Sequence, residues 1–142
     1  MSGPSLKKQD SHSSIHEAAL NEAKELRDVV NICLQNGEKE KVVQVVEIVI
    51  EHWESRTLKH AEAEEEGLYK ELVAEKPELE PLLIQFTRDH DLMRRMVEEM
   101  NHLLMNNEVD ERLVSLQDSL LMIAFIHNED EMNKLLHGNG KG

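Results

Sequence analysis

The chain has 142 residues, the length of one ordinary domain, and its formal net charge of −13 argues against nucleic acid or an anionic membrane as a partner. Aromatic residues are only 3% of the sequence, and glycine and proline are also few, which favours helices over a many-stranded sheet. There is no apolar run near the roughly 20 residues of a membrane span, no apolar secretory signal and no second cysteine to pair with Cys33. These features predict a cytoplasmic helical protein.

The first helix is predicted to begin at Ser14, because Ser14 and Glu17 fit a capping box. Residues 1–11 lack periodicity and are predicted to form a disordered tail. Inward-facing positions then recur every three or four residues, at His16, Ala19, Ala23, Leu26, Val30 and Cys33. Gly37 follows as the left-handed residue expected just past a helix end.

The second helix is predicted to begin near Glu38 and to be long. Its inner stripe is expected to contain Val42, Val46, Val49, Trp53, Arg56, His60, Ala63, Gly67 and Leu72. The β-branched run over 42–50 is also compatible with a strand, but the helical spacing continues beyond it and favours a helix. The helix is predicted to end at Lys76, because Pro77 disfavours the helical conformation in the residue before it.

Two further helices are predicted after this proline. The third carries an inner stripe of Leu83, Phe86, His90, Met93, Val97, Met100 and Leu104. Asn106 and Asn107 break it, and the fourth helix, from about Val109, carries Leu113, Leu116, Leu120, Ile123, His127, Glu131 and Leu135. Because short loops force neighbouring helices to be antiparallel, residues 12–137 are predicted to form an all-α, up-down-up-down four-helix bundle, followed by a flexible tail over 138–142.

One histidine lies on the inner stripe of each predicted helix, and counting residues from the turns places all four at one height in the bundle. The counts on the two sides of each turn differ by only two or three residues, which is about 3–5 Å at 1.5 Å per residue. The four histidines of this predicted layer are His16, His60, His90 and His127.

Two glutamates join the predicted layer. Glu64 is four residues after His60, and Glu131 is four residues after His127, so each pair faces the same side of its helix. Imidazole with carboxylate is a ligand mixture that accepts iron, manganese or zinc, and two glutamates able to bridge suit two metal ions better than one. The six residues are therefore predicted metal ligands, although a single inward histidine or one His-x-x-x-Glu pair would more often be structural.

Other polar residues have simpler interpretations. His52 is expected at the flank of the site rather than among its ligands, and His102 is expected to face solvent. His12 and His137 are expected at the surface, and Cys33 in the core. Either Glu65 or Asp130 could hydrogen-bond to a ligand imidazole. The methionines are interpreted as core filler, at Met93, Met96, Met100, Met105, Met122 and Met132.

Taken together, these residues resemble the hemerythrin-like family of HHE cation-binding domains. The resemblance covers residues from about 12 to 136, and its motifs are His16, the segment from His60 through Glu64 to Tyr69, His90, and His127-Asn-Glu-Asp-Glu131. It implies a non-haem di-iron centre of two Fe ions, bridged by the two carboxylates and by an oxo or hydroxo group.

The chain departs from the oxygen-carrying members of that family in two places. Those members have a second histidine four residues after the third-helix one, where this chain has Arg94, and they use His-x-x-x-x-Asp in the fourth helix where this chain has His-x-x-x-Glu. The resulting four-His, two-Glu set is more similar to bacterial di-iron proteins of iron–sulfur cluster repair and to eukaryotic iron-sensing domains. Arg94 either places positive charge near a bound anion or pairs with a glutamate at the bundle edge.

Three functions are compatible with this pattern. The first is a module that binds or senses O2, NO or the iron and redox state. The second is a di-iron enzyme or repair factor that acts on NO or peroxide or donates iron to damaged iron–sulfur clusters. The third is a metal-free or zinc-filled structural bundle that acts through partners. Whether the chain is an enzyme, its protein partner and its oligomeric state are left open by the sequence.

Overall fold

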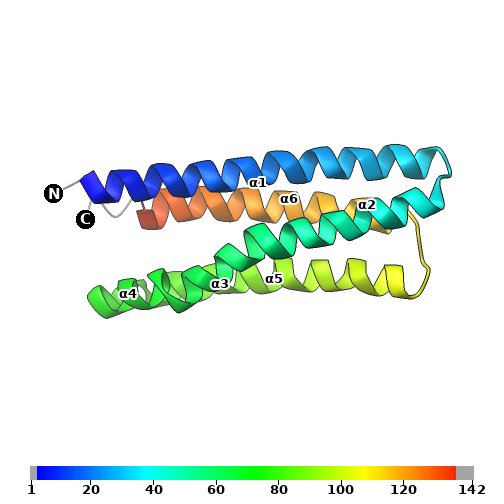
Figure 1. Cartoon of the computed structure of the whole chain (residues 1–142). Coiled ribbons are helices and arrows are strands. Elements are labelled where there is room, and N and C mark those ends of the chain that lie inside the picture. Colours follow the sequence, from blue (N-terminus) through cyan, green and yellow to red (C-terminus); the bar gives the residue numbers. More distant parts are fainter. Residues whose placement is uncertain (1–2, 137–142) are drawn as a thin grey trace.

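The computed structural model describes residues 3–136, with side chains for residues 14–135. It is an all-α bundle of four antiparallel helical segments, and no strand occurs within residues 3–136 (Figure 1). α1 packs against α2 and α6, and α5 packs against α6. In Figure 1, α1 and α6 lie along one side of the molecule, while α3, α4 and α5 lie along the other. The predicted up-down-up-down architecture is confirmed.

The first segment is the single helix α1 (Gly3–Gln35). The second segment consists of α2 (Lys39–His52), the π-helical turn η1 (Trp53–Leu58), α3 (Lys59–Glu66) and α4 (Leu68–Glu75). The third segment consists of the 3-10 turn η2 (Pro77–Leu79) and α5 (Glu80–Met105). The fourth segment consists of α6 (Arg112–Asp130) and the π-helical turn η3 (Glu131–Leu136). Among residues 3–136, no helical stretch combines the length and the hydropathy needed to span a bilayer.

The ends of the helices follow the predicted turns except at the start of α1. Gly37 has a φ of 71° and Asn107 a φ of 57°, so both turns use the left-handed conformation that ends a helix. The helix start predicted at Ser14 is wrong, because α1 is already helical from Gly3, within the expected tail. Residues 6–9 are Leu, Lys, Lys and Gln, which are all good helix formers. They allow the helix to begin N-terminal to the capping box. The tail predicted over 138–142 lies outside the described residues.

The π-helical turn η1 changes the inner face of the second segment. Val42, Val46, Val49 and Trp53 are buried as predicted. Beyond Trp53, however, Arg56 and Ala63 are exposed, whereas Ala61 and Glu64 are buried. A π turn takes more residues than an α turn, so the inward positions move by one residue along the chain. The predicted stripe is therefore wrong at Arg56 and Ala63, and His60 lies at the edge of the inner face.

Buried apolar side chains form two separate clusters. The larger includes Val30, Val46, Trp53, Met100 and Leu120. The smaller consists of Tyr69, Leu83, Phe86 and Leu135. Along each of the last three helical segments, the predicted ligand residues lie between members of the two clusters. We call these residues the polar layer: His16, His60, Glu64, His90, His127 and Glu131.

Candidate metal centre

The structure brings all six residues of the polar layer together inside the bundle. His16 comes from α1, His60 and Glu64 from α3, His90 from α5, and His127 and Glu131 from the last segment. Five of them are buried, and only the side chain of His60 is partly accessible, with 26% of its surface exposed. Neutral polar side chains at this depth require hydrogen-bond partners, and ionised ones require a nearby opposite charge, because unpaired buried polar groups and charges are costly.

Potential ligand atoms converge in two groups that share one carboxylate. In the first group, one ligand atom each from His16, His60 and Glu64 lie within 4.8 Å of one another. In the second, atoms from Glu64, His90 and His127 meet the same limit. The Nε2 atoms of His90 and His127 are only 3.1 Å apart, so both rings turn toward the same space.

Each of the two glutamates presents its two oxygens to histidines of different groups. For Glu64, Oε2 lies 3.7 Å from Nε2 of His60, and Oε1 lies 3.5 Å from Nε2 of His90. For Glu131, Oε1 lies 3.6 Å from Nε2 of His16, and Oε2 lies 3.6 Å from Nε2 of His127. Two carboxylates in this arrangement can bridge a pair of cations, with two imidazoles and two carboxylate oxygens on each side.

Carboxylates outside the polar layer orient two of the histidines. The Nδ1 atom of His90 donates to Oε2 of Glu65 at 2.7 Å, and Nδ1 of His127 donates to Oδ2 of Asp89 at 2.9 Å. A proton held on Nδ1 leaves the Nε2 lone pair free to face the centre, which is the tautomer a metal ligand needs. Of the two residues predicted as imidazole partners, Glu65 therefore has that contact, whereas Asp130 instead pairs with Lys134 at 3.7 Å. Asp89 was not predicted; its place directly before an inward histidine is the only signal.

Arg94 lies at the edge of the site rather than in its centre. It donates to Glu65 at 3.2 Å and to Asp91 at 2.9 Å. Its contact with Glu65 neutralises the carboxylate that holds His90. Of the two roles expected for Arg94, its contacts therefore match the pairing with a glutamate at the edge of the bundle.

Tyr69 is a functional candidate that the stripe pattern did not identify. Its hydroxyl donates to Oε2 of Glu131 at 2.5 Å, and its ring stacks on His90 with the centroids 5.9 Å apart. Gly67 interrupts the helix between α3 and α4, with φ −115° and ψ −84°, and this break directs α4 so that Tyr69 is buried against the polar layer. No periodicity reveals such a residue, because the break changes the phase of the helix.

The protonation behaviour of the polar layer reflects its burial and its crowded carboxylates. Burial, followed by the charge of Glu131, raises the pKa of Glu64 to about 10. Burial and the neighbouring His127 lower the pKa of His90 to about 3. Burial also acts to lower the pKa of His127, but its contacts with Glu131 and Asp89 outweigh it and raise that pKa. Two divalent cations would offset the crowded carboxylates with positive charge, so the donor set fits a metal pair.

The remaining histidines lie away from the centre. His52 is buried and its Nε2 is 2.9 Å from the carbonyl oxygen of Ala19, a structural contact at the flank of the site. His102 is exposed, as predicted. The side chain of His12 and all of His137 lie outside the described part of the chain. Cys33 is a buried free thiol of the larger apolar cluster.

A Tyr69→Phe variant should unfold at lower urea concentration than the wild type. The change leaves a buried carboxylate without its hydroxyl donor, and a hydrogen bond to a charged group contributes about 1.5–3 kcal/mol. Ser119→Ala is the matched control, because it removes an exposed hydroxyl that donates to Ser115. Equal urea midpoints for wild type and Tyr69→Phe would show that the Tyr69–Glu131 contact does not stabilise the fold.

Comparison with known proteins identifies one family. The sequence pattern of that family, described as Hemerythrin HHE cation binding domain, matches residues 13–137. The match includes every residue of the polar layer and also Glu65, Tyr69 and Asp89. No curated protein and no solved structure matches the chain.

Proposed function

Because the chain belongs to the hemerythrin HHE cation-binding domain family, we propose that it holds two non-haem iron ions and binds or senses O2, NO or the iron and redox state. The family binds cations, and the two groups of ligand atoms described above could hold them. The proposed ligands are the six residues of the polar layer, His16, His60, Glu64, His90, His127 and Glu131. Iron, rather than manganese or zinc, is the part of the proposal that rests on the resemblance alone.

The observation that carries the proposal is the two-sided arrangement of Glu64 and Glu131. Each glutamate faces one histidine on either side at 3.5–3.7 Å, which is the arrangement that two cations side by side would need. Bound iron would supply redox-active positions that accept small ligands. The protein supplies the imidazoles, orients two of them through Glu65 and Asp89, and surrounds the centre with apolar side chains that limit the access of water.

Metal analysis combined with an absorption spectrum tests this function. Purified protein loaded with ferrous iron without air should contain about two irons per chain, since each group of ligands takes one ion. Its visible absorption should change when O2 or NO is added and should recover when the gas is removed. Irreversible oxidation without a reversible adduct would contradict binding or sensing, and a protein that retains only zinc would contradict the iron centre.

A second candidate, a redox enzyme acting on NO or peroxide, is favoured by one observation. The hydroxyl of Tyr69 is a hydrogen-bond donor directly at the proposed centre. Repeated turnover of NO or peroxide by the iron-loaded protein would support this candidate. In that case Tyr69→Phe should slow turnover while leaving the iron content unchanged, whereas a single stoichiometric adduct would favour the binding function.

A further inference from the structure

Arg88 differs from the other arginines in having no acidic partner among residues 14–135. Every other arginine among the described residues forms an ion pair with a carboxylate, namely Arg27, Arg56, Arg94, Arg95 and Arg112. No described residue forms an ion pair or a hydrogen bond with the guanidinium of Arg88. In a chain with 29 acidic side chains against 16 basic ones, an arginine without a partner is available to bind an anion.

Arg88 lies at the rim of a cavity between α4 and α5. The cavity has a volume of about 560 Å³, and Lys70, which also forms no ion pair among the described residues, lines it from α4. Its apolar wall consists of Tyr69, Val73, Leu83 and Ile84. The volume falls within the range typical of sites for small organic molecules, about 300–1,000 Å³.

The two cations that line this cavity are not engaged by its acidic residues. Glu65 and Asp91 both contact the guanidinium of Arg94, whose single positive charge offsets one of the two carboxylates. Glu80 is the one lining carboxylate that forms no ion pair with a described cation. With Arg94 included, the three cations and three carboxylates balance. Arg88 and Lys70 form no ion pair with a described carboxylate, so their N–H donors are available to a ligand carboxylate.

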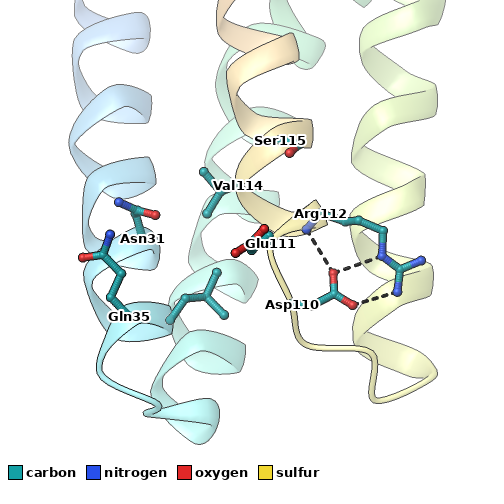
Figure 2. Close-up of a pocket in the computed structure, with 8 residues that line it drawn as sticks. Asn31, Gln35, Asp110, Glu111, Arg112, Val114 and Ser115 are labelled. Carbon is teal, nitrogen blue, oxygen red and sulfur yellow. Dashed lines mark hydrogen bonds and ion pairs between the residues drawn. The ribbon is translucent and has the colours of Figure 1, made fainter.

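Three other cavities lack this combination. One of about 770 Å³ lies at the far end of α1 and α6 and is lined by Arg112. There, Asp110 accepts hydrogen bonds from the backbone and the side chain of Arg112 (Figure 2), and Glu108 pairs with the same guanidinium. Arg56 lines two smaller cavities beside α1, but its guanidinium is held by Glu22 at 2.9 Å.

We propose that the cavity between α4 and α5 binds a small amphipathic carboxylate, with its apolar body on Val73, Leu83 and Ile84 and its carboxylate on Arg88 and Lys70. Arginine matches a carboxylate because its planar guanidinium can donate two parallel hydrogen bonds. The apolar wall gains from covering the body of the ligand, since burial of apolar surface is favourable. This site does not depend on the proposed iron centre, although Tyr69 contributes to both.

Calorimetric titration with decanoate tests the site on the purified 142-residue chain. Decanoate should bind saturably at one site per chain, and Arg88→Gln should weaken it by about tenfold, the effect of losing one charge-assisted hydrogen bond. Arg95→Gln is the matched control, because this exposed arginine lies on the same helix and pairs with Glu99 instead. Decanol has the same apolar body without the charge and should bind at least about tenfold more weakly than decanoate.

A second variant tests the contribution of the apolar wall to binding, independently of the charged groups. Val73→Trp should reduce decanoate binding by occupying the cavity, and circular dichroism would establish that the helices are retained. The proposal is overturned if decanoate shows no saturable binding, if decanol binds as tightly, or if Arg88→Gln and Arg95→Gln weaken binding equally. Because metal-free protein suffices for every titration, failure here would leave the iron centre unaffected.

Discussion

A Glu64→Gln variant is expected to bind less than about one tenth of the iron bound by the wild type while remaining folded. Glu64 is the carboxylate shared by both groups of ligand atoms, so its loss removes a ligand from each proposed iron position at once. The amide of glutamine is nearly the same size but carries no negative charge. It also resembles the protonated carboxyl that the metal-free site favours, since the pKa of Glu64 is raised to about 10. Elemental analysis and circular dichroism measure the two outcomes.

The matched control for this variant is Glu62→Gln. Glu62 lies on the same helix, α3, but its side chain is exposed and belongs to neither ligand group. It should retain the wild-type iron content. Full iron content in Glu64→Gln would show that the shared carboxylate is not a ligand, and it would contradict the arrangement proposed here.

Removal of iron is expected to lower the melting temperature by roughly 10–20 °C, the shift that corresponds to about 4 kcal/mol of binding energy for a chain of this size. Metal that binds the folded chain but not the unfolded one stabilises the fold through that difference. His127→Ala should remove most of the same stabilisation, because His127 is buried in the centre and its ring belongs to the second ligand group. Thermal unfolding of the iron-loaded and chelator-treated proteins measures the effect.

His102→Ala provides the control, because His102 is exposed and outside the polar layer. This variant should show the same difference between loaded and chelated protein as the wild type. If chelation leaves the melting temperature of the wild type unchanged, the proposed centre does not bind iron tightly enough to support a function.

The stabilisation by iron should increase with pH between 6 and 8. In the folded metal-free protein Glu64 keeps its proton up to a pKa of about 10, whereas an ordinary glutamate, with a pKa of 4.5, has lost it. At Glu64 the unfolded chain therefore binds fewer protons across this interval, and this group makes the metal-free fold less stable as the pH rises. Iron must displace that proton, so it binds more tightly at higher pH. His90, with its pKa lowered from 6.5 to about 3, is already neutral in the metal-free fold, so iron displaces no proton from it and the pH dependence of iron binding is unchanged by this residue.

The convergence of the polar layer could be predicted from the sequence because helices are regular over long distances. Each residue advances the chain by a fixed 1.5 Å, so counting from Gly37 and Asn107 places residues of different helices at one height. Those two turns are also readable locally, because glycine and asparagine tolerate the left-handed conformation that both adopt.

The details that the sequence did not predict arise where this regularity is broken. The π-helical turn over 53–58 moves the inner face by one residue, which left Arg56 and Ala63 exposed. The break at Gly67 brings Tyr69 onto Glu131 from outside any stripe. Counting inward positions assumes an unbroken α-helix, so neither irregularity follows from the stripe, although Gly67 is a residue of low helix propensity.

Because the core is divided into two clusters, the two ends of the bundle bury different amounts of apolar surface. The smaller cluster has only four buried side chains, and it is separated from the larger one by imidazoles and carboxylates. Cooperative units of a protein open with free energies that follow the apolar surface they bury. We therefore expect the end built from α4, η2 and η3 to open at a lower free energy than the end that holds the larger cluster. Opening at that end would give solvent a route to Glu131 and His127, which are buried in the closed bundle.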